Sequence, residues 1–107
     1  MAYKVLAQSN PSATTATTLY TVPASSAAVI STITICNQAA SAASYRIAVR
    51  PAGATLANQH YIVYGVSLSA GATFTYTGGV TLATTDVVTV YSTNGTTSFN
   101  AFGSEIA

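Results

Sequence analysis

Ionisable side chains that could act as a nucleophile or a general base are few in this chain of 107 residues. Cys36 and His60 are each the only residue of their kind, so a nucleophile–base pair would have to join these two. Nothing in their spacing places them together, and no carboxylate is evident that would orient the histidine. The only acids, Asp86 and Glu105, do not form the carboxylate pair that glycoside hydrolysis requires. The sequence therefore predicts a protein that is not an enzyme and has no catalytic residues.

Metal ions and phosphate-bearing cofactors also lack the residues that would bind them. A metal centre needs several His, Cys, Asp or Glu ligands, and the chain has too few of them for a convincing site. Gly78-Gly79 is the strongest glycine pair, but neither a lysine nor a helical pattern follows it, as a phosphate-binding loop would require. We therefore expect no metal and no cofactor requirement.

Charged side chains make up 5% of the residues, against about a quarter in an average soluble domain. The chain has no basic patch for nucleic acid and no polybasic or long apolar segment for a membrane. Low charge also removes the self-repulsion that keeps proteins apart. This composition predicts a protein that lies against other proteins. Arg46 and Arg50, the only nearby basic pair, are either solvated or part of such an interface.

The aromatic residues offer a second candidate for an interface. Tyr61, Tyr64, Tyr76 and Tyr91 lie in predicted strands, and Phe102 lies in the last one. Each tyrosine has an apolar ring and a polar tip, so it can cover the core edge, join a protein interface or stack on a sugar. All three interpretations remain open. An exposed row of tyrosines beside a shallow groove would favour glycan binding.

Short alternating segments, separated by turn residues, continue along the whole chain and predict strands. We expect them at residues 2–8, 18–22, 28–37, 45–50, 60–68 (with a bulge at Gly65), 73–77, 80–82, 87–92 and 96–102. The expected fold is all-β: one domain over residues 1–107, an antiparallel sandwich of about eight strands, with a jelly roll as the natural closure. The polar segment Ser9 to Thr17 is a linker or an extended arm that could dock on a partner.

The strand periods also predict faces and a core. In residues 28–37, Val29, Ile33 and Ile35 are expected to face the core, and Ile30 is expected on the other face. Asn94-Gly95 is a type I′ turn signal, which predicts a two-residue hairpin that pairs Val90 with Phe99. The predicted core consists of Ile33, Ile35, Ile47, Val49, Val88, Val90 and Phe99.

Localisation follows from the cysteine and the N-terminus. A single Cys36 cannot form an intramolecular disulfide, which fits synthesis and assembly in a reducing cytoplasm. The residues after Lys4 include no apolar run of the length that a signal peptide requires.

Several strings of strand and turn residues resemble those of a known class of proteins. They are TLYTVP at residues 18–23, ITICNQ at 33–38, YRIAVRP at 45–51, DVVTVY at 86–91 and SFNAFGSE at 98–105. Together they resemble small virion proteins of tailed bacteriophages, especially phages of cyanobacteria and other marine bacteria. The resemblance covers nearly the full chain, and it implies a non-enzymatic structural protein of the particle, made in the cytoplasm of the host bacterium.

The resemblance leaves the position in the virion open. The leading expectation is a capsid decoration or cement subunit, a homo-oligomer and by family analogy a trimer, bound to the major capsid protein. The alternatives are a tail, collar or baseplate component bound to tail proteins, or a β-sandwich module that binds host glycans.

Overall fold

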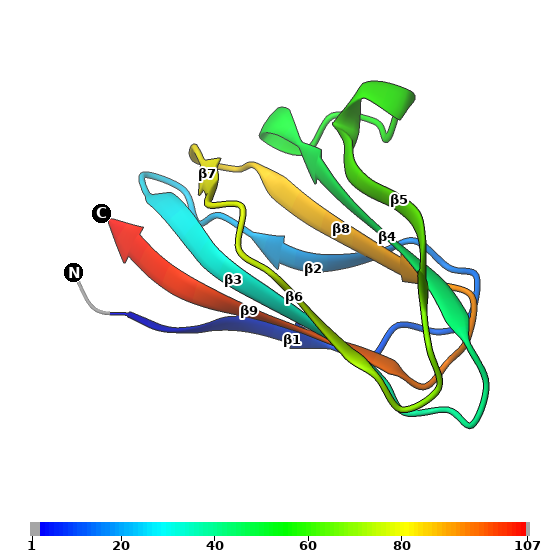
Figure 1. Ribbon diagram of the computed structural model, residues 1–107. Helices are drawn as coiled ribbons and strands as arrows, with labels where there is room; N and C mark the ends of the chain where they lie inside the picture. The colour runs from blue at the N-terminus through cyan, green and yellow to red at the C-terminus, as the bar shows by residue number, and fades with distance from the viewer. Residues whose placement is uncertain (1–2, 107) are drawn as a thin grey trace.

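The computed structural model describes residues 3–106, which form nine strands and two short 3-10 helices (Figure 1). The strands are β1 (Lys4–Ser9), β2 (Thr17–Thr21), β3 (Ala27–Asn37), β4 (Ala43–Arg50), β5 (Tyr61–Leu68), β6 (Thr73–Tyr76), β7 (Val80–Leu82), β8 (Val87–Ser92) and β9 (Thr97–Ile106), and the 3-10 helices are η1 (Pro51–Gly53) and η2 (Asn58–His60). The prediction of an all-β protein is confirmed.

The strands form two antiparallel sheets that pack face to face. The first sheet has the order β1-β9-β3-β6, and β7 pairs with β3 beyond the end of β6. The second sheet has the order β2-β8-β4-β5. Because β6 and β7 share one position beside β3, the sandwich has eight strand positions and the strand order of a jelly roll. The predicted antiparallel sandwich is therefore the observed fold.

The core lies between the sheets and contains the residues that alternation predicted. Of the seven predicted core residues, six are at most 1% exposed, and Val49 is half-buried and packs against them. The core also contains Tyr45 and Ile30, which were not among the predicted core residues and are both 1% exposed.

A β-bulge in β3 explains why the prediction of its two faces was partly wrong. Ile30 pairs with Gly103 and Thr32 pairs with Phe102, so Ser31 is an extra residue without a partner on β9. The extra residue reverses the side-chain alternation at that point. Ile30 therefore points into the core together with Ile33 and Ile35, whereas Val29 is only half-buried.

The hairpin predicted at Asn94-Gly95 is wrong, because β8 and β9 belong to opposite sheets. Val90 pairs with Ile47, and Phe99 pairs with Ile35, so the two side chains meet across the core and are not neighbours on one sheet. The Asn94 side chain accepts hydrogen bonds from the backbone N–H of Thr96 and from the hydroxyl of Thr97. These bonds hold the loop that leads from β8 in the second sheet to β9 in the first.

The segment from Ser9 to Thr17 is a linker and not a free arm. Ser9 ends β1, Thr17 begins β2, and Pro11 between them is buried. The backbone N–H of Thr14 donates to the carbonyl of Ser92 at 2.8 Å. This connection therefore carries the chain from the first sheet to the second and is part of the packed structure.

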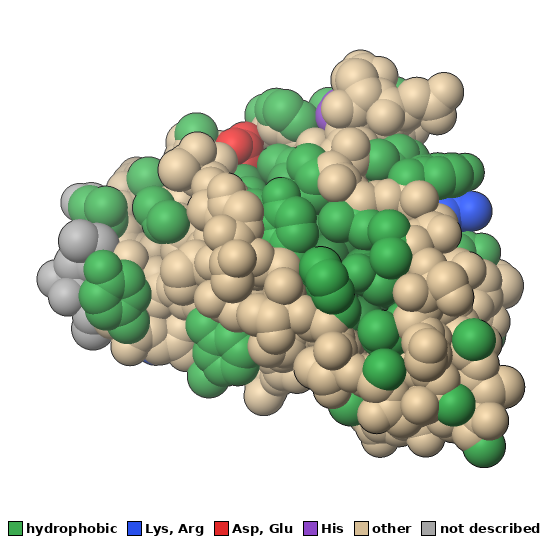
Figure 2. Space-filling model, viewed as in Figure 1, with side chains coloured by type: hydrophobic (Ala, Val, Ile, Leu, Met, Phe, Trp, Pro, Cys, Tyr) green, Lys and Arg blue, Asp and Glu red, His purple; other side chains and the backbone are tan. Residues whose placement is uncertain are grey.

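The side of the sandwich between β5 and β6 is open. Phe74 and Val66 pair with Ile35 and Tyr45, which are both buried, so they lie on the inner faces of their sheets. They are nevertheless 44% and 43% exposed. Figure 2 shows hydrophobic side chains gathered between these two edge strands. Part of the apolar interior is thus at the surface.

Candidate binding face

Four of the seven predicted interface residues meet on the outer face of the second sheet. Arg46 in β4 pairs with Tyr64 of β5 on one side and with Tyr91 of β8 on the other. Side chains directly opposite one another on neighbouring strands lie about 5 Å apart, so the three stack in one line across the sheet. The guanidinium carbon of Arg46 lies 4.3 Å from the centroid of each tyrosine ring. Two cation–π contacts thus hold the arginine between two rings.

Tyr61 extends this line because β5 contains two bulges. The register of β5 against β4 shifts at Ile62 and again at Gly65. Residues three apart on a regular strand point to opposite faces, but the bulge at Ile62 places Tyr61 on the same face as Tyr64. Their rings meet edge to face with centroids 4.9 Å apart. We call Tyr61, Tyr64, Arg46 and Tyr91 the Tyr–Arg row.

Gly65 has a conformation that the second bulge requires. Its φ of 68° lies in the left-handed region, where glycine carries no penalty. The predicted bulge at this residue is confirmed. It turns Val66 back toward the interior, together with Val63, and leaves Tyr64 outside.

A shallow depression of about 450 Å³ lies beside the row and is lined by Asn58, Tyr61 and Tyr64. Asn58 begins η2, in the connection between β4 and β5. Tyr64, which forms part of this wall, is 60% exposed. A row of tyrosines therefore lies beside a shallow groove, as glycan binding would favour, but Tyr64 is its exposed member and Tyr61 and Tyr91 are half-buried.

The charge of Arg46 has no opposite partner among residues 3–106. The ion pair found there joins Lys4 to Glu105, and Asp86 accepts the backbone N–H groups of Ala52 and Ala83, each at 2.9 Å. No acceptor for the guanidinium N–H groups of Arg46 is found in the described part of the chain, so its contacts there are the two rings. This arginine could bind an anion.

Arg50 lies on the same strand but has a structural role. Its Nε donates to the hydroxyl of Thr89 at 3.1 Å, and its Nη1 donates to the carbonyl of Ala54 at 2.9 Å. These bonds fasten the connection after β4 to the sheet. Arg50 is therefore not a free interface residue.

The remaining two predicted interface residues lie elsewhere. Tyr76 pairs with the buried Ile33, so it faces inward at the β6 edge of the first sheet. Phe102 is half-buried on the outer face of that same sheet, opposite Thr32 and Val5. Tyr91 and Phe102 are thus on the outer faces of different sheets.

Cys36 and His60 lie at opposite ends of the sandwich. Cys36 pairs with Thr73, which follows the turn after β5, whereas His60 directly precedes β5. The eight residues of β5 separate these points by roughly 25 Å. The buried His60 accepts the backbone N–H of Ala57 through its Nδ1. No group of three or more His, Cys, Asp or Glu residues that could hold a metal ion occurs in the described part of the chain.

Two polar clusters that sequence reasoning missed hold the sheets together at either end. At one end, the fully buried Asn37 donates through its amide nitrogen to the carbonyls of Ser41, Leu68 and Ser69. Its amide oxygen accepts from the backbone of Ala39 and from the side chain of Asn94. Nothing in the local sequence distinguishes this asparagine from the others.

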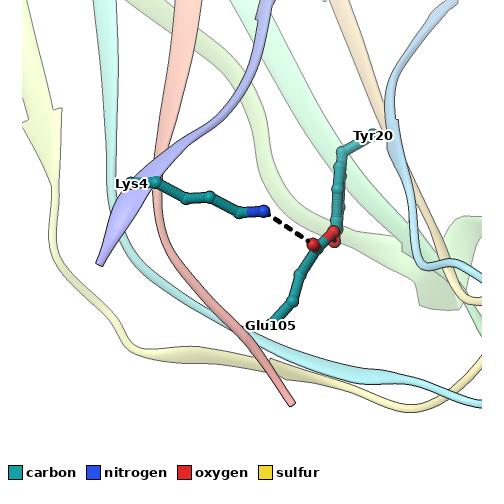
Figure 3. A network of polar contacts seen from close by, with 3 residues as sticks. All are labelled: Lys4, Tyr20 and Glu105. Carbon is teal, nitrogen blue, oxygen red and sulfur yellow. Dashed lines mark hydrogen bonds and ion pairs between the residues drawn. The ribbon is translucent and has the colours of Figure 1, made fainter. Parts of the chain in front are cut away.

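At the other end, Glu105 of β9 lies between Lys4 of β1 and Tyr20 of β2 (Figure 3). The Lys4 ammonium is 3.0 Å from one carboxylate oxygen, and the Tyr20 hydroxyl donates to the other. These two hydrogen bonds lower the pKa of Glu105. Burial, and then the bond to Glu105 and its charge, raises the pKa of Tyr20 well above the ordinary tyrosine value.

No protein-family model, no curated protein and no solved structure matches this chain. Among the described residues, no helix is long and apolar enough to cross a membrane.

Proposed function

We propose that this chain is a non-enzymatic structural protein of a bacteriophage particle, namely a capsid decoration or cement subunit. The phage context comes from the resemblance of its strand and turn strings to small virion proteins. The physical support comes from the surface of the sandwich.

The observation that carries the proposal is the open side between β5 and β6. Phe74 and Val66 belong to the inner faces of the two sheets, yet 44% and 43% of their surfaces remain exposed. Both strands are also sheet edges, with backbone N–H and C=O groups that no neighbouring strand pairs in the described chain. A contact with another chain would bury these side chains and satisfy these groups.

The small number of charges supports such contacts. Desolvating an ionised side chain costs far more than desolvating a hydroxyl or an amide, provided that the neutral group finds a hydrogen-bond partner. With 5% charged residues, most of this surface can be covered at low cost. The same argument predicts that attachment weakens little as salt rises.

The partners in this proposal are further copies of the chain and the major capsid protein. A homo-oligomer buries the β5–β6 side, and the resemblance implies a trimer. A tail, collar or baseplate component bound to tail proteins is the alternative within the same class, and the same open side supports it.

The location is tested with particles of the phage that encodes the chain. Mass spectrometry of gradient-purified particles should detect the protein, and electron cryomicroscopy should place it on the capsid lattice. Density on the tail would instead support a tail, collar or baseplate component. Absence of the protein from purified particles would reject both.

The oligomer is tested separately by sedimentation of the purified protein. We expect the wild type to sediment as an oligomer and Phe74→Asp as a monomer with an unchanged circular dichroism spectrum. Val5→Asp is the matched control, because Val5 is 50% exposed and lies in β1, away from the open side. A monomeric wild type would contradict the role assigned to this side.

A further inference from the structure

We propose that the Tyr–Arg row and the depression beside it bind an acidic glycan, with Arg46 holding the carboxylate of a uronic acid. This inference goes beyond a structural role in a particle and does not depend on where the protein is located. It rests on the geometry of the row, the unpaired charge of Arg46 and the nature of the surrounding side chains.

The tyrosine rings supply the surface on which a sugar ring can lie. One face of a pyranose ring presents C–H groups, which pack against an aromatic ring, while its hydroxyls point outward to polar partners. Tyr64 is 60% exposed, and together with Tyr61 and Asn58 it lines a depression of about 450 Å³. Ligand sites fall in the range of about 300 to 1,000 Å³. The side-chain amide of Asn58 can both donate to and accept from hydroxyls there.

Arg46 is already held between two rings on the outer face of the sheet. Tyr64 and Tyr91 lie on the strands on either side of it, and each ring centroid is 4.3 Å from its guanidinium carbon, so a ligand would reach the N–H groups at the outer edge of the guanidinium. A planar carboxylate accepts two parallel hydrogen bonds from such an edge. Because the stacking already restricts the long side chain, binding loses less conformational entropy than it would with a free arginine.

The surroundings favour a sugar over a protein partner. The neighbours of the row on this face are small. Ser44, Ser67 and Thr89 are polar, and the apolar Ala48, which pairs with Tyr61, is buried. The centre of a protein interface is apolar, and such a surface occurs here on the open side formed by Phe74 and Val66. A ligand that combines stacking with hydrogen bonds to hydroxyls and one charge matches the row better.

The experiment is a titration of the ¹⁵N-labelled full chain with tetragalacturonate, followed by NMR, with neutral galactotetraose as the comparison. We expect saturable shifts centred on the row and on Asn58 with the acidic oligomer, and at least tenfold weaker binding of the neutral one. Arg46→Gln and Tyr64→Ala should each weaken binding at least tenfold. Arg46→Lys keeps the charge and loses the planar edge, so it should also bind more weakly than the wild type.

Two controls separate the row from general effects. Lys4→Gln removes the same charge from the first sheet, and Tyr3→Ala removes another exposed tyrosine, so both should change the affinity less than twofold. Circular dichroism shows whether each variant is folded, and Arg46→Lys keeps the test decisive if Arg46→Gln does not fold.

Two results would overturn the proposal. The first is the absence of saturable binding by the wild type, and the second is equal affinity for the two oligomers. If the wild type binds no glycan and Arg46→Gln detaches the protein from particles, the row is a protein interface.

Discussion

The two ends of the sandwich join the same two sheets by different interactions. At the end of β3, Asn37 is fully buried and its amide bonds to the loops that follow β3 and β5 and to Asn94 in the loop after β8. At the beginning of β3, the network of Lys4, Tyr20 and Glu105 includes two ionised groups near the surface, with side chains 54% and 24% exposed for the ion pair. The eleven residues of β3 separate these ends.

The two kinds of polar contact contribute differently to stability. A buried neutral amide that loses its partners leaves several carbonyls without hydrogen bonds, and water cannot replace them. An exposed ion pair that is broken is simply hydrated, so surface pairs contribute about 1 kcal/mol or less. We therefore expect the Asn37 end to determine stability independently of pH, and the Glu105 end to adjust it with pH.

The largest effect is expected from a backbone contact at the Glu105 end. Gly103 pairs with both Lys4 and Ile30, and a Cβ atom added there would lie 1.9 Å from the carbonyl oxygen of Val29. Because that atom is backbone in the bulged part of β3, it cannot move aside cheaply. Gly103→Ala should lower the free energy of unfolding by roughly 3 kcal/mol or more, measured by urea denaturation.

Gly71→Ala is the control for Gly103→Ala. Gly71 has a φ of 67°, and nothing lies within 4 Å of an added Cβ. It should cost only the left-handed conformation, roughly 1–2 kcal/mol. Equal losses for the two variants would show that the sheet adapts at Gly103 and that its close packing is unimportant.

Asn37→Ala tests the other end directly. It removes an amide group whose two N–H groups are shared among three carbonyls and whose oxygen accepts two hydrogen bonds, all at a fully buried position. We expect a loss of about 2–4 kcal/mol in the free energy of unfolding, the same at pH 5 and pH 8, because no group in this cluster titrates. Asn100→Ala removes an amide bonded to the exposed Gln8 and should change stability by less than about 0.5 kcal/mol. If Asn37→Ala lowered the free energy of unfolding as little as Asn100→Ala, the buried amide would not determine stability at this end.

The sequence predicted the strands of this fold better than it predicted their arrangement. Alternation identified the strands and most of the core, because burial of one face imposes period 2 on each strand. It could not assign strands to sheets. Asn94-Gly95 predicted a type I′ hairpin, but neither residue has the positive φ that this turn requires, and the chain passes into the opposite sheet.

The sequence identified the residues of the candidate binding face, but it did not predict that they lie side by side. Tyr61, Tyr64, Tyr91 and Arg46 were each recognised as interface candidates. Their meeting depends on the register of three strands and on the bulge at Ile62. Bulges are set by packing on neighbouring strands, so a period-2 pattern places Tyr61 and Tyr64 on opposite faces when they in fact share one.

Replacement by phenylalanine should change the free energy of unfolding in opposite directions at Tyr45 and Tyr20. The hydroxyl of Tyr45 is buried and has no hydrogen-bond partner among the described residues, and burial raises its pKa. Tyr45→Phe should therefore stabilise the protein by about 1 kcal/mol, since it removes an unsatisfied polar group and keeps the ring contact with Phe99. Tyr20→Phe breaks the bond to Glu105 and should destabilise by about 1 kcal/mol. Thermal unfolding at pH 7 distinguishes the two, and destabilisation by Tyr45→Phe would contradict this account.

The smallest effect concerns pH at the Glu105 end. The pKa of Glu105 is lower in the folded protein than in the unfolded chain, so its contribution is complete at neutral pH and is lost as the pH falls through the folded pKa. The pKa of Tyr20 is raised, so its contribution is lost as the pH rises beyond the ordinary tyrosine value of about 10. Glu105→Gln should be slightly less stable than the wild type at pH 7, and the difference should shrink as the pH falls below the ordinary glutamate value of about 4.3, as measured by thermal unfolding at a series of acidic pH values. Lys4→Gln is the matched control, because it removes the partner charge and leaves the Tyr20 bond to Glu105 in place. It should retain part of the acid-dependent loss that Glu105→Gln abolishes. A difference between wild type and Glu105→Gln that stays constant with pH would mean that the carboxylate contributes through its shape and not through its charge.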